Sequence, residues 1–523
     1  MQLRPVIACV SLLAGTLVAL SGTTAQAAPT RYEAENSPAI CTGTIDSNWA
    51  GYSGSGFCNA NNATGAFAQF TVTAATAGTA TVQVRFANGT TVARPAAVTV
   101  NGSAAASASF EGTSTWSAWA TTTLTVPVNA GSNTVRLTPT TSAGLPNLDY
   151  LDVEAGTTTP PTGSAVYVAP NGTDGAAGTQ SAPTTLASAI TRVTPGGTIY
   201  LRGGTYHYAQ TITVPPGNNG TSANRTQLSA YPGETPVLNF SAMAEDPANR
   251  GLALNGSYWR VNGIVVEHAG DNGIFVGGSN NIIERTVTRF NRDSGLQISR
   301  AASTTPKDQW PANNLVLSSE SHDNADSGGE NADGFAAKLT SGPGNVFRYD
   351  VSHHNIDDGW DLYTKTDTGP IGPVTIEDSL SFSNGTLSDG TQNTNGDRNG
   401  YKLGGDDIKV NHIVRRDIAY DNGHHGFTYN SNPGSMTVSD NVSIDNDERN
   451  YSFDAGTSVF RNNVSCRSAS GSNDKTIGDA DSSNQFWTGS NGSRCSAYSG
   501  ALHWSFATDG RLVVTFGGSA ITP

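Results

Sequence analysis

The chain has 523 residues, of which 36% are hydrophobic and only 14% are charged, and it contains 59 glycines. This balance excludes a coiled coil, a multi-span membrane protein and a charge-driven disordered chain, while the length predicts two or three domains. With 29 basic and 43 acidic residues the formal charge is −14, which argues against nucleic acid as a partner, because phosphate binding depends on lysine and arginine.

Residues 1–28 have the pattern of a secretory signal peptide. Arg4 supplies the charged start, Val6 to Leu20 is mostly apolar, and Ala25-Gln26-Ala27 precedes the expected cleavage point. The apolar run is too short to be a membrane span, and no later segment approaches the required length. We therefore expect a secreted, extracellular protein with no membrane segment after the signal is removed.

The cysteines predict two disulfide bonds. Cys9 leaves with the signal, so four cysteines remain in an oxidising compartment. We expect the near neighbours to pair, Cys41 with Cys58 and Cys466 with Cys495, because each pair closes a short loop.

Residues 29–156 are expected to form a β-sandwich. Apolar residues alternate along short segments that turn residues separate, and no helical period occurs. The predicted strands are Ala68–Val72, Ala80–Phe86, Ala97–Val100, Ala120–Val126, Asn133–Leu137 and Leu148–Val153. Residues 157–164 follow with two prolines and no apolar anchor, which is the composition of a linker.

Residues 165–523 contain a repeat that predicts a parallel β-helix. Gly251, Gly273 and Gly295 are spaced 22 residues apart. The same frame returns at Gly334, Gly359, Gly400 and Gly426. Apolar or aromatic residues stand one and three positions after each of these glycines, so both positions face inward in a strand. One short buried strand per repeat is typical of a solenoid.

Two further features complete the predicted solenoid. Asn291, Asn324, Asn355 and Asn422 recur at turns, where asparagine tolerates positive φ and can bond to the neighbouring coil, so we expect a structural ladder. The tail Leu502–Gly518 alternates apolar residues and could cap the exposed end of the solenoid. The predicted fold is therefore all-β.

The position two residues after each glycine faces outward, and in two successive repeats it is occupied by a charged residue, Asp361 and then Lys402. Lys402 is predicted one coil above Asp361, while Asp333 and Asp358 each precede a frame glycine and Asp357 lies alongside. Close carboxylates repel by about 1–4 kcal/mol per pair, so they persist only if some are protonated or a cation lies among them. An all-oxygen ligand set favours calcium over zinc or iron, and the alternative is that these aspartates only cap turns.

Two roles for Lys402 remain open from the sequence. As a partner of Asp361 it would stay charged, whereas a base must be neutral, against a reference pKa of about 10.4. A bound divalent cation would lower the pKa of Lys402 and offset the effect of Asp361. Lys338, Lys365 and Lys409 are by default expected to be solvated surface groups.

This region contains the three strings ENADGFAAKL, HNIDDGWDLY and NGYKLGG. Together they resemble the family-nine polysaccharide lyases of the pectate lyase L type. The likeness extends from about Ala165 to about Trp487 and implies a right-handed parallel β-helix. It also implies a set of functional residues. Asp333, Asp357, Asp358 and Asp361 would bind calcium, Lys402 would be the Brønsted base, and we assign Lys338 and Arg398 to substrate binding.

The resemblance implies a reaction as well. A secreted pectate lyase would cleave de-esterified polygalacturonate by calcium-assisted β-elimination and release unsaturated galacturonides. Because Lys402 must be neutral to take the C5 proton, we expect an alkaline optimum. The stretch Thr386–Arg398 is longer than expected for the family, so the shape of the substrate cleft is not fixed by the likeness.

The first segment resembles carbohydrate-binding modules of family thirty-five, with family six as a close neighbour. The opening YEAEN and the closing PNLDYLDV carry this likeness. It implies that Glu33, Glu35 and Asp152 bind a structural calcium and that Asn147 and Trp119 contact sugar. Trp119 could equally be an ordinary core residue.

Two alternatives come from other functional classes. A β-helix hydrolase of the polygalacturonase kind needs paired acids that activate water, and His424-His425 offers a histidine. A non-catalytic polysaccharide-binding adhesin could use the solenoid as a stalk, but a stalk needs no outward Asp/Lys patch. We expect a monomer whose partner is pectin or polygalacturonate.

Overall fold

The computed structural model describes residues 29–74, 78–128, 131–155 and 165–521. The chain divides into two compact units between Thr158 and Thr159. The predicted signal peptide (residues 1–28) and the whole of the predicted linker (157–164) lie outside the described residues. In the described part of the chain, no helix has the length and apolar character needed to cross a bilayer.

The first unit is an antiparallel β-sandwich, as predicted. One sheet contains β1 (Thr30–Glu33), β3 (Gly43–Asp46), β4 (Phe57–Ala60), β6 (Gly78–Ala87), β9 (Ala120–Val128) and β11 (Asn147–Ala155). The other contains β2 (Ile40–Cys41), β5 (Ala68–Ala74), β7 (Arg94–Val100), β8 (Ser103–Phe110) and β10 (Gly131–Pro139). Alternate residues of both sheets meet in one buried core. All six predicted strands are present; the short strands at the start and the alanine- and serine-rich β8 were not predicted.

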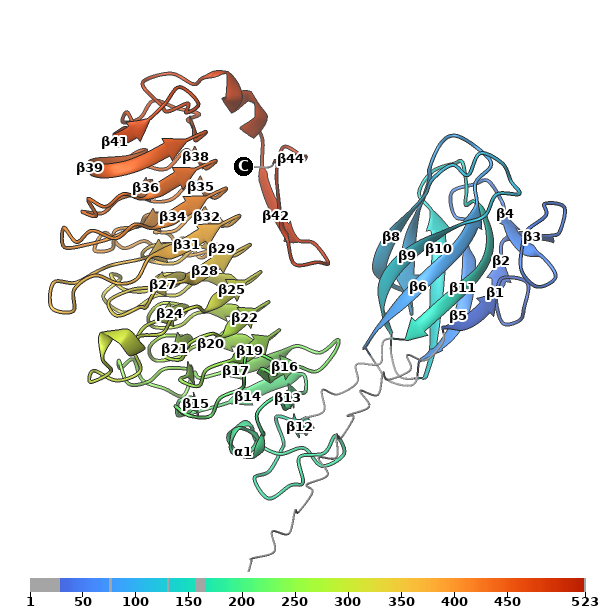
Figure 1. Ribbon diagram of the computed structural model, residues 1–523, viewed down its shortest axis with the longest axis horizontal. Helices are drawn as coiled ribbons and strands as arrows, with labels where there is room; N and C mark the ends of the chain where they lie inside the picture. Colours follow the sequence, from blue (N-terminus) through green and yellow to red (C-terminus); the bar gives the residue numbers. More distant parts are fainter. Residues whose placement is uncertain (1–28, 75–77, 129–130, 156–164, 522–523) are drawn as a thin grey trace, which may run out of the picture. The chain divides into compact units, whose positions relative to one another are not determined.

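The second unit is a parallel solenoid whose coils stack along one axis (Figure 1). We call its three strand faces the first, second and third face. The first face contains β15 (Ile212–Val214), β18 (Leu252–Leu254), β21 (Ile274–Val276), β24 (Leu296–Ile298), β27 (Phe335–Ala337), β30 (Trp360–Asp361), β33 (Tyr401–Lys402), β36 (His425–Thr428) and β39 (Arg449–Arg461).

The other two faces complete each coil. The second face contains β12 (Ala165–Val168), β13 (Thr198–Leu201), β16 (Thr226–Ala230), β19 (Trp259–Asn262), β22 (Ile282–Glu284), β25 (Leu315–Leu317), β28 (Asn345–Arg348), β31 (Val374–Glu377), β34 (Ile413–Arg415), β37 (Thr437–Ser439) and β41 (Lys475–Ala480). The third face contains β14 (Gly204–His207), β17 (Pro236–Asn239), β20 (Val265–Glu267), β23 (Val287–Arg289), β26 (Glu320–His322), β29 (Val351–His353), β32 (Leu380–Phe382), β35 (Ile418–Tyr420), β38 (Val442–Ile444) and β40 (Val464–Cys466). Helix α1 (Leu186–Arg192) packs on the first coils, and the short η1 (Lys307–Gln309) lies in a loop.

The interior of the solenoid confirms the predicted register. The residues one position after the frame glycines are buried and pair in register from coil to coil. In the upper coils Phe335, Trp360, Tyr401 and Phe427 form an aromatic stack, which Tyr451 of the next coil extends although it follows Asn450 and not a glycine; the ring centroids are 5.0, 4.9, 4.6 and 5.2 Å apart. Stacked rings bury large apolar surfaces, so this column anchors the coils that carry the outward charges.

The asparagine ladder is also confirmed. The buried side-chain amide of Asn324 donates to the Oδ1 of Asn355 at 2.8 Å, and Asn355 donates in turn to Asn384 at 2.9 Å. The same bond continues from Asn384 to Asn422 at 3.0 Å. Asn384 was not predicted. Each bond satisfies a buried polar group and contributes about 0.5–1.5 kcal/mol.

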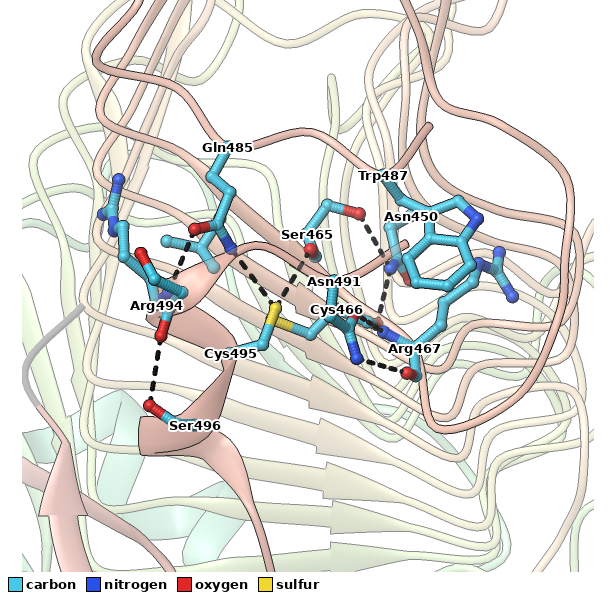
Figure 2. The surroundings of a disulfide bond; sticks show 12 residues. Asn450, Ser465, Cys466, Arg467, Gln485, Trp487, Asn491, Arg494, Cys495 and Ser496 are labelled. Carbon is cyan, nitrogen blue, oxygen red and sulfur yellow. Dashed lines mark hydrogen bonds between the residues drawn. A yellow bond between two sulfur atoms is a disulfide. The ribbon is translucent and has the colours of Figure 1, made fainter. Parts of the chain in front are cut away.

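Both predicted disulfides are present, Cys41–Cys58 and Cys466–Cys495. Cys466 ends β40, and its partner Cys495 lies in the 3₁₀ helix η2 (Ser493–Tyr498), so the second bond ties the chain after the last coil to the third face (Figure 2).

The C-terminal segment does not cap the end of the solenoid as predicted. It forms an antiparallel sheet of β42 (Leu502–Phe506), β43 (Leu512–Phe516) and β44 (Ser519–Ile521). Val514 and Phe516 pack on the third face, where Val351 and Leu380 belong to the same buried cluster. The segment covers this flank because the third face presents apolar residues on its outer side, which would otherwise contact water.

Candidate active site

The outward column of the first face has the predicted register. Asp361 is the strand partner of Lys402, with Ala336 below and Thr428 above. Both charged side chains lie in the floor of this face, because Asp361 is 3% and Lys402 8% exposed. A carboxylate and an amine are thus held side by side by rigid strands, one coil apart.

Three further carboxylates meet beside this pair. Asp333, Asp357 and Asp358 are buried, and each offers an oxygen that lies within 4.8 Å of those of the other two. Asp333 and Asp358 occupy the position before a frame glycine in adjacent coils, which explains why they stack. The predicted convergence of four aspartates and Lys402 is therefore present.

Backbone and amide donors hold these carboxylates in place. Asp357 Oδ1 accepts from the N–H groups of Asp397 at 2.5 Å and Arg398 at 3.2 Å. Asp358 Oδ1 accepts from the backbone N–H of Asn399 at 2.6 Å and from its side-chain amide at 2.9 Å. Asp358 Oδ2 accepts no hydrogen bond from the described residues although it is buried. One oxygen of Asp358 is thus fixed by hydrogen bonds, whereas the charged partner of the other is the Lys402 amine at 3.2 Å, with which a cation would share it.

Two lysines neutralise part of this charge. Lys402 Nζ lies 2.8 Å from Asp397 Oδ2, 3.2 Å from Asp358 Oδ2 and 3.9 Å from Asp361 Oδ2. Lys338 Nζ lies 2.6 Å from Asp333 Oδ2 and 3.2 Å from Asp361 Oδ2. The expectation that Lys338 is a solvated surface group is wrong, because the residue is 8% exposed and folds back from the end of its strand onto the aspartates.

Burial dominates the protonation of the aspartates. It raises the pKa of Asp333 to about 8, against the opposing charge of Lys338. It also raises the pKa of Asp358 to about 6, and that of Asp357 well above its usual value. Some of these carboxyl groups therefore carry protons near neutral pH when no cation is bound.

The pKa of Lys402 responds to two opposing effects. Burial disfavours the charged ammonium, but the surrounding carboxylates outweigh burial and raise the pKa far above its usual value. The first of these carboxylates are Asp361 and Asp358. Because a cation among the aspartates would compensate the same negative charge, it would bring the pKa of Lys402 down.

The donor set fits a hard divalent cation. Asp333, Asp357, Asp358 and Asp361 supply only oxygen, and calcium binds carboxylate oxygens in flexible geometry. The buried Asp358 Oδ2 without a hydrogen bond is the kind of atom that such an ion satisfies. Within the described chain, no nitrogen or sulfur ligand belongs to this cluster, so the composition of the site does not favour zinc.

Asp397 was not predicted, whereas Arg398 was predicted to bind substrate and remains a prediction. Asp397 lies in an irregular segment and reaches Lys402 at 2.8 Å with a side chain that is 51% exposed. The Arg398 side chain passes between Gly385 and Gly423 and lines a cavity of about 640 Å³ together with Asp421. The backbone of Arg398 supports the site, whereas its side chain lines this neighbouring cavity.

In the sandwich unit, the predicted set of calcium ligands requires a correction at Asp152. Arg31 binds the carboxylate of Asp152 with two hydrogen bonds, at 2.8 and 2.7 Å. Asp149 instead is fully buried, and burial raises its pKa to about 6, with the charges of Glu33 and Glu35 adding to the rise. Glu33 Oε2 and Glu35 Oε2 are buried without a hydrogen-bond partner among the described residues, which fits a cation held by the two glutamates. Asp149 accepts from the backbone N–H of Ser53 at 3.0 Å and lies 3.3 Å from Arg85.

Trp119, for which sugar contact and a core position were both left open, is half-buried in the structure. The Trp119 indole donates to the Ala50 carbonyl at 3.0 Å and packs edge-on against buried Phe57. Trp116 lies against the backbone of Gly89, next to the strand that pairs Ala87 with the predicted Asn147.

The second unit is similar to known proteins. A family model described as "Pel9A-like, right handed beta helix region" matches residues 166–463, more than half of the chain. The chain belongs to this family. Pectate lyase L of Paenibacillus polymyxa (strain SC2) is 53% identical over 351 residues, which cover 67% of this chain and 78% of that protein. The crystal structure of pectate lyase Pel9A is similar with a TM-score of 0.57 and 32% identity, over 68% of this chain and 88% of that one. The right-handed β-helix that the resemblance to the family-nine lyases implies is therefore confirmed.

The sandwich unit has its own relatives. A model of carbohydrate-binding module family 6 matches residues 38–155, which is the family named above as a close neighbour of family thirty-five. The exo-beta-D-glucosaminidase of Amycolatopsis orientalis is 47% identical over 124 residues, covering 24% of this chain and 12% of that protein. The second unit and the sandwich thus match separate families.

Proposed function

We propose that this protein is a secreted pectate lyase that cleaves de-esterified polygalacturonate by calcium-assisted β-elimination. The observation that carries the proposal is the amine of Lys402, which lies 3.2 Å from Asp358 Oδ2 and 3.9 Å from Asp361 Oδ2 on one wall of the solenoid. A base and a cation site are thus adjacent, as this elimination requires.

The cation site consists of Asp333, Asp357, Asp358 and Asp361. When bound, calcium supplies a positive charge that attracts the uronate carboxylate and acidifies the proton on the neighbouring C5. A bound calcium ion would also reduce the repulsion between the protein and its substrate, because a chain with a net charge of −14 would otherwise repel a polyanion.

Lys402 takes the C5 proton as its neutral amine. The electron pair of the C5–H bond then forms the C4–C5 double bond while the C4–O bond breaks and its electrons leave with the oxygen. No water is consumed, and the new chain end is an unsaturated uronide. The strand partners of Lys402 fix its position, so the amine needs little reorganisation to reach the proton.

The sandwich unit is proposed to bind polysaccharide and to hold a structural calcium with Glu33 and Glu35. Asn147 and Trp116 are its proposed sugar contacts. Secretion is supported by the signal-like pattern of residues 1–28 and by two disulfide bonds, which persist in oxidising compartments. We propose that the secreted protein acts as a monomer.

One assay separates this function from its alternatives. Full-length protein is incubated with polygalacturonate and calcium while the ultraviolet absorbance of unsaturated product and the reducing ends are followed together. A lyase produces both signals, and a chelator abolishes both. A hydrolase would release reducing ends without absorbance, and an adhesin would produce neither signal.

A matched pair of variants locates the cation in the same assay. Asp361→Asn removes a proposed ligand, and we expect activity at limiting calcium to fall at least tenfold. Asp367→Asn makes the same change on a carboxylate that is 80% exposed, and its activity should equal that of the parent. Equal calcium dependence in both variants would contradict the assignment of Asp361.

A further inference from the structure

A second group of ligand atoms lies one coil above the base, outside the aspartate cluster. His424, His425 and Glu448 each offer an atom within 4.8 Å of those of the other two. His424 Nε2 is 2.9 Å and His425 Nε2 is 4.0 Å from the same carboxylate oxygen, Glu448 Oε2. The other oxygen of Glu448 binds Arg449, so Oε2 is the one that faces both imidazoles.

The hydrogen bond between His424 and the Asp397 carbonyl shows which ring nitrogen of His424 carries the proton. The other nitrogen, which has the lone pair, faces the Glu448 carboxylate. Nδ1 lies 3.1 Å from the backbone carbonyl of Asp397, which is only an acceptor, so Nδ1 carries a proton. In a neutral imidazole Nε2 then presents a lone pair to Glu448 Oε2 at 2.9 Å. Two lone pairs repel at that distance unless a proton or a metal ion lies between them. Donation of the other ring N–H to a backbone carbonyl is typical of metal-bound histidine.

His425 is an unpartnered ligand aimed at the same place. The residue is 8% exposed, and neither of its ring nitrogens makes a hydrogen bond with the described residues. The two imidazole rings are stacked 20° from parallel, with centroids 3.9 Å apart, so a small rotation of one ring brings both Nε2 atoms to one ion.

We propose that His424, His425 and Glu448 bind a divalent transition-metal ion of the zinc type. Two imidazoles and one carboxylate form a nitrogen-rich set that zinc accepts with a fourth position left to water, whereas calcium prefers oxygen alone. His424 and Glu448 are 37% and 38% exposed at their side chains, so an ion can enter from solvent. The inference is independent of the proposed function.

The bound ion would fix the segment that borders the base. His424 holds the carbonyl of Asp397, and the Asp397 carboxylate contacts Lys402. An ion on the other side of the imidazole would therefore tie this irregular segment to β36 and β39. The three ligands act on the position of Asp397, and they do not contact the Lys402 amine in the described structure.

The test uses full-length protein without a polyhistidine tag, stripped of metal with a chelator and then saturated with calcium. Zinc is titrated by calorimetry, and cobalt is titrated separately while its visible absorption is recorded. We expect one zinc ion per chain to bind in excess calcium, and cobalt to give the absorption of a site with nitrogen ligands. His425→Ala and Glu448→Gln should each weaken zinc binding at least tenfold.

His207→Ala is the matched control because His207 is exposed and lies on the third face, and its zinc affinity should equal that of the parent. Thermal unfolding establishes that each variant is folded, and Glu448→Gln keeps the shape of the side chain if His425→Ala does not fold. Zinc affinity in Glu448→Gln within twofold of the parent would overturn the proposal. Complete displacement of zinc by calcium would overturn it too, and His424 would then be an imidazolium paired with Glu448.

Discussion

Protons compete with calcium for the aspartate cluster, and this competition predicts how calcium binding depends on pH. Burial raises the pKa of Asp333 to about 8 and that of Asp358 to about 6 in the calcium-free protein. A ligand carboxylate must be ionised, so each bound proton has to leave before the cation is held. Calcium binding therefore strengthens as pH rises through these two values and weakens as pH falls.

The magnitude follows from the two titrations. At pH 7 Asp333 is about nine-tenths protonated and Asp358 about one-tenth, so calcium binding releases about one proton from this pair. Between pH 8 and pH 6 the combined protonation lowers the apparent affinity about 100-fold, which corresponds to about 2.7 kcal/mol.

Isothermal titration calorimetry of the full-length protein at pH 6, 7 and 8 measures this effect. Repeating the titration at pH 7 in two buffers with different ionisation heats gives the number of protons released. The variant Asp333→Asn should bind calcium more weakly, and its affinity should change less with pH than that of the parent, since the carboxyl group with the pKa of about 8 is gone. An affinity of the parent protein that changes less than about threefold between pH 6 and pH 8 would refute the reasoning.

Three more outcomes are expected. Activity at saturating calcium should rise toward alkaline pH because Lys402 must be neutral, and a profile that is flat down to mildly acidic pH would count against Lys402 as the base. Asp397→Asn removes a carboxylate that raises the pKa of Lys402, so the rising limb of the pH–rate profile should move down by about one pH unit, and an unchanged limb would exclude this influence. Trp360→Ala opens a cavity in the interior aromatic stack and should cost about 3–5 kcal/mol in urea unfolding, whereas a loss below about 1 kcal/mol would mean that the stack is not essential.

The solenoid and the outward column could be predicted because both follow from one periodicity. A strand alternates its faces strictly, so the frame glycines fix which residues point outward, and Asp361 and Lys402 pair as expected. The burial of Lys338 against the aspartates could not be predicted in this way, because Lys338 lies beyond the end of β27, where alternation no longer applies. The contact of Asp397 with Lys402 could not be predicted either, because an irregular segment has no period from which a side-chain direction follows.

In the sandwich, Asp152 was expected from the resemblance and not from alternation, and the structure has a local irregularity beside it. The pairing of β11 with β6 shifts register between Leu148 and Leu151, so alternation counted through this stretch is out of phase. Asp149 is therefore buried beside the glutamates, while Asp152 faces Arg31. The C-terminal sheet is a different case, because alternation predicted its strands but could not indicate which surface they cover.

The most direct test of the central claim compares Lys402→Ala with the parent protein at saturating calcium. We predict that kcat for unsaturated product falls by about 10²–10⁴, the usual contribution of a general base. Calcium affinity should stay equal or increase, because the ammonium that competes for Asp358 and Asp361 is gone. Lys365→Ala, which removes a lysine that is 52% exposed, serves as the control and should keep full activity. Calcium-saturated Lys402→Ala protein that forms unsaturated product within tenfold of the parent rate would contradict the account.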